Sequence, residues 1–357
     1  MRFIPLILGA VAIISTAIPL SKHQAWWIRI FDFPRLQIVF VGLIGFIWHV
    51  AAGGLTSVTG MVLAVFLAVA LAYQAFMIFP YTRLAPLQTE WSTDPKPEST
   101  ISLLFANVQE NNRDAERLKR ILAETDADLV LLVETDDWWL GQVMDTLSDY
   151  PYTVLQPQSN TYGMLLFSRL ELIGPRVRFL IQDDIPSIHG RVRLRSGDLV
   201  EFRCLHPRPP APAEFKNAVP RDAEIIIVGS ENRKDDLPFI VFGDLNDVAW
   251  SRTNYLFQNI SGLLDPRVGR GFYHTFHAKI PFLRFPLDHL FHSNHFRLVD
   301  FRRLGYFGSD HFPVFGKLSL EPGAELEQEE LMPEKDEIMD AKEKVSTAEA
   351  GKADPPA

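Results

Sequence analysis

The stretch LPFIVFGDLND, residues 237–247, joins an apolar run to a polar strand end. The run Phe239–Phe242 is typical of a short buried strand. Gly243 allows the chain to turn tightly where that strand ends. Because side chains alternate along extended chain, Asp244 and Asn246 are expected on the same side. The stretch therefore predicts a strand that presents a carboxylate and an amide at its end.

The same arrangement, an apolar run bordered by polar residues, recurs elsewhere between residues 103 and 314. The segments are FANVQ with Asn107, DLVLLVETDD with Glu134, CLHPRPP with His206, LDHLFHS with Asp288, and GSDHFPV with Asp310 and His311. Loops at strand ends can converge on one cleft. No single segment identifies an enzyme, but their joint occurrence predicts one.

The remaining pattern of residues 101–320 predicts an α/β fold. Helical periodicity follows Asn112, where Ala115, Leu118 and Leu122 share a face. A second helix is expected over residues 214–228, interrupted by Pro220. So many strand candidates in about 220 residues predict two packed mixed sheets flanked by helices.

The polar strand ends are suited to hydrolysing a phosphate ester, which needs a metal to neutralise the phosphate and a group to activate water. Mg²⁺ prefers oxygen ligands, so Glu134 and Asp310 are the expected metal ligands. Asn107 is expected to complete this set of ligands or to orient it. Mn²⁺ is the alternative ion. The expected catalytic roles are water activation by Asp244, phosphate binding by Asn246, a protonated His311 held by Asp288, and a second phosphate-facing donor or acid at His206.

The order Asn, Glu, His, GDLN, Asp, SDH resembles the endonuclease/exonuclease/phosphatase superfamily, the group of DNase I-like nucleases, sphingomyelinases and inositol phosphatases. The resemblance covers roughly residues 99–320, and GDLN followed by SDH is its specific part. It implies a four-layer α/β sandwich, a Mg²⁺-dependent phosphoesterase, and the same residue roles. By this likeness Tyr162, ahead of a Ser-Arg pair, is expected to contact the phosphate. Arg208 is expected to be a second substrate contact because it neighbours His206, a proposed catalytic residue.

Each of these residues also has an ordinary structural interpretation. Asp244 fits the cap of a helix that begins near Asp247, and Asp288 and Asp310 fit turns at strand ends. His289, His292 and His295 have a spacing that invites a zinc site, but a strand and turn would splay them, so a structural role is expected. The ordered set of motifs, rather than any one residue, favours catalysis.

Three long apolar runs, residues 4–20, 36–52 and 58–80, precede this domain. The last is long enough to cross a hydrocarbon core of roughly 30 Å as a helix. The runs predict three transmembrane helices, although the first alone also fits a cleaved signal peptide. Lysine and arginine positions favour a cytoplasmic C-terminal domain, but a Trp-rich connector can break that bias and the single Cys204 fits either side. A multi-pass membrane protein is expected, with the side of the domain left open.

Four parts are therefore expected: a membrane anchor (1–88), an exposed linker (89–100), a catalytic domain (101–320) and an acidic tail (321–357) that is disordered or loosely helical. Residues 99–320 carry 25 Lys and Arg against 28 Asp and Glu, so the domain lacks the positive charge of a protein that tracks nucleic acid.

Two functions remain open on the sequence. The favoured one is a membrane-anchored, metal-dependent phosphoesterase acting on a phospholipid headgroup or a nucleic acid. The alternative is a non-catalytic membrane receptor or scaffold that uses the same fold for binding. The lipid bilayer and a phosphate ester are the partners indicated, and no protein partner is.

Overall fold

The computed structural model describes residues 3–211, 216–232 and 237–353, which fall into two compact units. The first unit comprises residues 1–86, 210–218 and 269–271, and the second comprises the rest. The apolar runs predicted to form the anchor lie in the first unit. The motifs at strand ends lie in the second.

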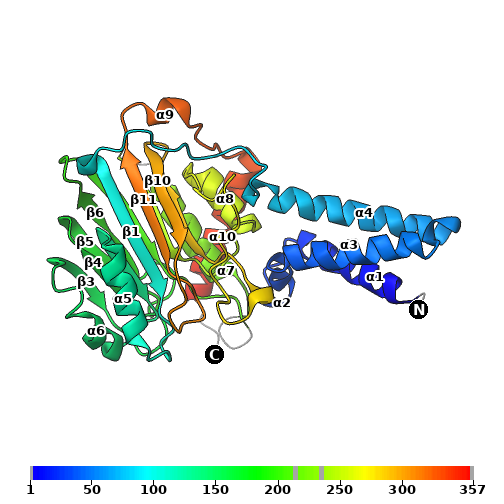
Figure 1. Ribbon diagram of the computed structural model, residues 1–357, viewed down its shortest axis with the longest axis horizontal. Helices are drawn as coiled ribbons and strands as arrows, with labels where there is room; N and C mark the ends of the chain where they lie inside the picture. The colour runs from blue at the N-terminus through cyan, green and yellow to red at the C-terminus, as the bar shows by residue number, and fades with distance from the viewer. Residues whose placement is uncertain (1–2, 212–215, 233–236, 354–357) are drawn as a thin grey trace. The chain divides into compact units, whose positions relative to one another are not determined.

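Three long helices dominate the first unit: α1 (Phe3–Ala17), α3 (Arg35–Ala51) and α4 (Val58–Ile78). Each contacts the other two, and Figure 1 shows them side by side. Ala12, Ile38 and Leu67 form their shared core. The short elements are α2 (Trp26–Arg29) and the 3₁₀ turns η1 (Ile18–Leu20), η2 (Ile30–Asp32), η3 (Gly54–Thr56) and η4 (Phe79–Tyr81).

Two or three segments of this unit are long and apolar enough to cross a membrane. Phe3–Leu20 and Val58–Tyr81 meet that criterion alone. The third candidate is the pair Trp26–Asp32 and Arg35–Ala51, which bends by 71° between its halves. Helix α3 has only 17 residues, so it reaches spanning length only together with the segment before it. Three expected transmembrane helices thus correspond to two or three candidate spans.

The second unit contains two mixed sheets. One has the order β10-β11-β1-β2-β4-β3 and the other β5-β6-β7-β8-β9, with β1–β2 and β7–β8 the parallel pairs. The strands are β1 (Thr100–Asn107), β2 (Leu129–Val133), β3 (Tyr152–Gln156), β4 (Met164–Ser168), β5 (Leu172–Arg178), β6 (Ser187–Arg193), β7 (Leu199–Leu205), β8 (Phe239–Asp244), β9 (Asp288–His292), β10 (Phe296–Arg303) and β11 (Val314–Leu320).

Helices cover the outer face of each sheet. They are α5 (Ala115–Thr125), α6 (Asp137–Val143), α7 (Val219–Glu231) and α8 (Arg252–Ser261). Strand β1 is buried on both faces: Leu103 and Phe105 belong to the core between the sheets, and Leu104 to the core beneath α5 and α6. A third core packs β8 against α7 and α8. The expected four-layer α/β sandwich is confirmed.

The expected interruption at Pro220 is wrong. Pro220 lies in the first turn of α7, where a proline removes no helical hydrogen bond. Residues 214 and 215 of the expected helix lie outside the described residues.

Most of the segment 89–100 is exposed, as expected, but the segment is hydrogen-bonded to β10 rather than a free tether. Thr89 is fully buried and hydrogen-bonds Nε2 of His292 at 3.0 Å. Backbone hydrogen bonds join Ser92 and Glu90 to Leu298 of β10, and a 3₁₀ turn, η5 (Pro97–Ser99), leads into β1. Its Pro, Ser and Thr content predicted a tether because composition does not reveal that β10 leaves a free edge for this segment.

Of the two states expected for the acidic tail, disordered or loosely helical, the tail shows helix, because it contains α9 (Ala324–Glu327) and the longer α10 (Lys335–Ala353). Helix α10 packs on α7 and α8, with Ala341 and Ala348 buried, and Nζ of Lys344 bonds Oδ2 of Asp222 at 2.7 Å. The high charge predicted disorder or a loose helix, but small side chains recur at helical spacing and give one packing face.

Glu224 makes stability depend on pH. It lies on α7 with 2% of its surface exposed, and its Oε1 has no hydrogen-bond partner among the described residues. Burial raises its pKa from 4.5 to about 8, so stability falls as the pH rises from 4.5 through 8. Glu224→Gln is expected to raise the unfolding free energy by about 2–4 kcal/mol above pH 8 and to change little near pH 4, as measured by Tm against pH.

Glu231, on the same helix, is the matched control. Its carboxylate is paired with Arg178 and Arg203, and although burial opposes this, hydrogen bonds to His189 and these arginines lower its pKa. Glu231→Gln is therefore expected to lower the Tm at neutral pH. A Glu224→Gln protein whose Tm falls together with that of Glu231→Gln would contradict the pH dependence assigned to Glu224.

Candidate active site

Polar side chains from both sheets meet at one end of the sandwich. Asn107 ends β1 and lies beside Val133, the last residue of β2, immediately before Glu134. Asp244 ends β8 and is paired in register with Asp288, the first residue of β9. Nδ2 of Asn107 bonds Oδ2 of Asp244 at 3.0 Å, so a hydrogen bond joins the two sheets at this point.

Asn107 organises the carboxylates through its amide. Besides Asp244, its Nδ2 donates to Oε1 of Glu134 at 2.6 Å, while its Oδ1 accepts from the backbone amide of Gln109 at 2.9 Å. The amide therefore faces the carboxylates and the oxygen faces the backbone. This geometry suits the orienting role expected for Asn107 better than direct metal ligation.

Glu134 is a partly buried carboxylate. Burial raises its pKa to about 7; the hydrogen bond from Asn107 and the charge of His311 oppose the rise, while Asp244 and Asp310 add to it. Its backbone has φ of 58°, a conformation that turns the chain directly after β2. A nearby cation stabilises the charged form of such a carboxylate.

Asp244 stands at the centre of the group. Burial raises its pKa while His311 opposes this. Gly243 precedes it with φ of 138°, and a Cβ there would lie 2.2 Å from the carbonyl oxygen of Leu205, so only glycine fits between β7 and β8. Oδ1 of Asp244 accepts from the backbone amide of Asn246 at 2.9 Å. Asp244 does not cap a helix, because α8 begins at Arg252 and its cap is Ser251.

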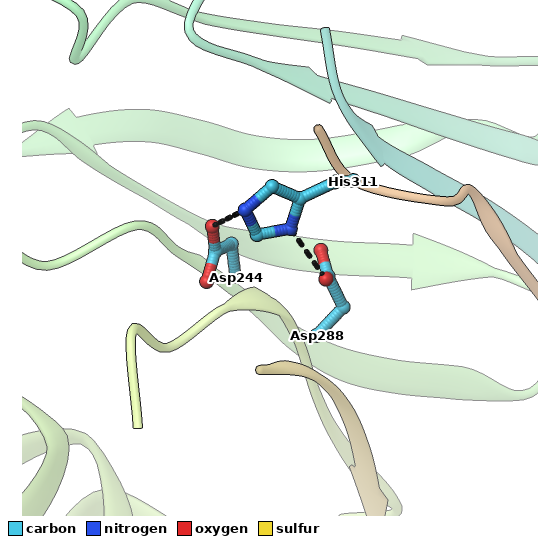
Figure 2. A group of neighbouring side chains, drawn as sticks. All are labelled: Asp244, Asp288 and His311. Atoms are coloured by element: carbon cyan, nitrogen blue, oxygen red, sulfur yellow. Dashed lines mark hydrogen bonds and ion pairs between the residues drawn. The ribbon is translucent and has the colours of Figure 1, made fainter. Parts of the chain in front are cut away.

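His311 lies between two aspartates (Figure 2). Its Nδ1 is 2.8 Å from Oδ2 of Asp288 and its Nε2 is 3.6 Å from Oδ2 of Asp244. Burial lowers its pKa, but the charges of Asp288 and Asp244 outweigh this and raise the pKa to about 10. His311 is thus a cation at neutral pH, as expected from its pairing with Asp288.

His206 also lies near Asp244, with Nε2 3.8 Å from the Oδ2 atom that faces His311. Burial lowers its pKa to about 4, so it is neutral at pH 7 and does not act as an acid in this state. Its Nδ1 is buried and has no hydrogen-bond partner among the described residues. The ring of Tyr162 lies 5.4 Å from its ring.

The remaining expected residues border this group. Asn246, with φ of 53°, donates from Nδ2 to the carbonyl oxygen of Pro207 at 3.0 Å, which ties it to the His206 loop. Arg208 lies 5.1 Å from the centre of the Tyr162 ring and bonds Asp184 at 2.6 Å. Asp310 is partly exposed, and its backbone oxygen accepts from the amide of Ala278 at 2.6 Å.

Sequence reasoning missed three supporting residues. The hydroxyl of Ser309 donates to the backbone oxygen of Asn107 at 2.8 Å and accepts from the amide of His311 at 3.0 Å. Thr275 accepts from the amide of Asp288 at 3.2 Å, and the ring of Phe276 lies 4.9 Å from that of His311. Ser309 stands inside the SDH motif and carried a signal, whereas Thr275 and Phe276 lie in an aromatic loop without a motif.

The candidate zinc ligands His289, His292 and His295 do not form a cluster. His289 bonds Arg267 and the backbone oxygen of Asp247, while His292 bonds Thr89. The rings of His289 and His292 are thus each held by separate structural contacts.

The charge balance of the site fits a divalent cation. Four carboxylates, those of Glu134, Asp244, Asp288 and Asp310, are accompanied by one cationic imidazole. Ligand atoms of Asp244, Asp288 and His311 lie within 4.8 Å of one another, but Nδ1 of His311 is occupied by Asp288. Carboxylate oxygens in excess over cations are the donor set that Mg²⁺ and Mn²⁺ prefer.

Two helix-covered mixed sheets with a polar site at their strand ends define an α/β sandwich protein of the kind expected from the sequence. The chain belongs to the Endonuclease/Exonuclease/phosphatase family, whose match spans residues 104–311.

Solved structures share this fold. An endonuclease/exonuclease/phosphatase from Bacteroides vulgatus matches with a TM-score of 0.51 at 15% identity, covering 63% of this chain and 100% of that chain. A family protein from Bacteroides thetaiotaomicron matches at 0.50 and 18%, covering 64% and 99%, and humanized TDP2 of D. rerio at 0.50 and 14%, covering 62% and 99%. No curated protein sequence matches significantly.

Proposed function

We propose that this chain is a membrane-anchored, divalent-metal-dependent phosphoesterase that cleaves a phosphodiester or phosphomonoester by attack of water. The observation that carries the proposal is the hydrogen-bonded group Asn107, Glu134, Asp244, Asp288 and His311, which both sheets contribute. Membership of a family of phosphate-ester hydrolases supports it.

Glu134 and Asp310 would hold Mg²⁺ or Mn²⁺, with Asn107 fixing the direction of the Glu134 carboxylate. When bound, the ion neutralises charge on the phosphate and polarises its P–O bonds. Burial raises the pKa of Glu134, and the charges of Asp244 and Asp310 add to the rise, so a cation would stabilise the charged carboxylate. The site is thus arranged to gain stability from a cation.

Asp244 accepts a hydrogen bond from the attacking water and orients it. His311 carries its protons on both ring nitrogens because Asp288 holds Nδ1, and the proton on Nε2 can be donated to a phosphate oxygen. Asn246 has a second amide hydrogen for the substrate, and the neutral His206 is a hydrogen-bonding rather than an acidic group. Tyr162 and Arg208 form the outer edge of the phosphate site.

The first unit serves as the membrane anchor and the second as the catalytic domain. The candidate spans within residues 3–81 support this division. A phospholipid headgroup and a nucleic acid remain the two substrate classes, and the near-neutral charge of residues 99–320 favours the headgroup.

Metal binding can be tested without a substrate. We expect Mg²⁺ or Mn²⁺ to raise the Tm of the purified full-length protein, and Glu134→Gln to weaken this effect by at least about tenfold in metal concentration. Without metal, Glu134→Gln is expected to have an equal or higher Tm, because it removes a partly buried charge. A metal response that Glu134→Gln leaves unchanged would contradict the assignment of Glu134 as a ligand.

A further inference from the structure

The loop beside the active site carries basic and apolar side chains that have no role in the proposed hydrolysis. Between Asp265 and Asp288 the sequence contains four Lys or Arg and no Asp or Glu. At its tip lies a 3₁₀ turn, η7 (Pro281–Leu283), flanked by Lys279 and Arg284. Phe282 is 73% exposed and Leu283 is 41% exposed. Two large apolar side chains thus project from a basic loop.

The loop is fixed to the edge of the site. The backbone amide of Ala278 donates to the backbone oxygen of Asp310 at 2.6 Å. The backbone oxygen of Ala278 accepts from Nη2 of Arg284 at 3.1 Å. Nζ of Lys279 bonds Oε1 of Gln109, two residues after Asn107, at 2.9 Å. Whatever contacts the tip therefore lies beside the metal-binding residues.

Two arginines, Arg284 beside the tip of the loop and Arg303 at the end of β10, have no counter-charge among the described residues. Arg303 and Arg284 both stack on the ring of Phe312, at 4.2 and 5.1 Å from its centre. Arg303 donates a hydrogen bond to the backbone oxygen of His274 and Arg284 to that of Ala278, and neither forms an ion pair with a carboxylate among the described residues. Nε of Arg284 is buried and has no partner there either. An anionic group would relieve this concentration of positive charge.

We propose that the loop Lys279–Arg284 is a lipid-surface contact of the second unit. Phe282 and Leu283 enter the region between headgroups and acyl chains, and Lys279, Arg284 and Arg303 bind anionic phospholipid headgroups. Exposed aromatic and aliphatic residues bordered by cations are the arrangement that binds such interfaces. A nucleic acid would use the cations but leave the apolar tip in water. This contact is additional to the N-terminal helices and does not require hydrolysis.

Leu326 provides a matched control position. It is 86% exposed and apolar, but lies on α9 between Glu325 and Glu327. An anionic bilayer should attract the loop and repel this site, although both expose a large aliphatic or aromatic side chain.

The test uses the full-length protein in bilayer nanodiscs of phosphatidylcholine, with or without phosphatidylglycerol. Phe282→Cys and Leu326→Cys are labelled with an environment-sensitive fluorophore, since the native Cys204 is fully buried. We expect a blue shift and quenching by brominated lipid chains at position 282, stronger with phosphatidylglycerol, and neither effect at position 326. Lys279→Gln with Arg303→Gln is expected to remove the extra quenching that phosphatidylglycerol causes.

A label at position 282 that is unquenched in both bilayers would overturn the proposal and leave the tip to a protein partner. Equal quenching at both positions would also overturn it, because the label alone would then explain the signal. Neither readout depends on catalysis, so failure of the phosphoesterase proposal would leave this result interpretable.

Discussion

Asp244→Asn is expected to lower kcat for phosphate-ester hydrolysis by at least about 10³-fold while leaving the protein folded. Asp244 receives hydrogen bonds from Asn107 and the amide of Asn246 and lies within 3.8 Å of both His206 and His311. The substitution keeps the shape of the side chain but removes the charge that faces His311 and that we propose orients the attacking water. Because burial opposes that charge, the Tm of the variant is expected to stay level or rise.

Asp128→Asn is the matched control for this prediction. Asp128 is also a buried aspartate beside β2, but it bonds Ser102, five residues before Asn107 and so roughly 17 Å along β1 at about 3.3 Å per residue. Its variant is expected to lose Tm and keep kcat. If Asp244→Asn lost Tm and Asp128→Asn lost kcat by the same factor, activity would be following stability rather than chemistry.

Asp288→Asn is expected to move the alkaline limit of activity to lower pH. In the native site His311 stays protonated up to a pKa of about 10, because the charges of Asp288 and Asp244 outweigh burial. With the Asp288 charge removed, the imidazole loses its proton earlier, and the protonated fraction falls about tenfold for each pH unit above the new pKa. At pH 8 we expect kcat to fall by about 10²–10³-fold, with partial recovery at pH 6.

The measurement is a pH–rate profile of wild type and variant at saturating metal. The Asp300→Asn variant, at an exposed pair with Arg302, is the control and should follow the wild type. Profiles with the same alkaline limit in Asp288→Asn and wild type would show that His311 does not act as a cation.

The sequence predicted those features that local chemistry determines. Asn107, Glu134 and Asp244 could be placed at strand ends because an apolar run ends directly before each of them. Pairing His311 with Asp288 required only that a cationic imidazole needs a carboxylate, and the two lie 2.8 Å apart. The sandwich could be predicted because several of its strands, among them β1, β2, β4 and β8, are short and apolar, whereas β3 and β5 are less apolar and partly exposed and carried no such signal.

Features that depend on distant partners could not be predicted. The segment around Thr89 is ordered by His292, more than 200 residues later, and α10 by Asp222 on α7. Burial lowers the pKa of His206 to about 4 although the charge of Asp244 opposes this, and no local pattern encodes burial. Likewise Thr275 supports Asp288 only because a loop folds back between β9 and β11.

Phosphate-ester cleavage by the purified full-length protein tests the proposed metal-dependent phosphoesterase activity most directly. Plasmid DNA, RNA and phospholipid vesicles are offered separately, with Mg²⁺, Mn²⁺ or EDTA, to the wild type and to Asp244→Asn. We expect cleavage of at least one substrate class, and this cleavage should require both the metal and Asp244. Cleavage that persists in EDTA or in Asp244→Asn, or a folded, metal-binding protein that cleaves none of the three, would contradict it.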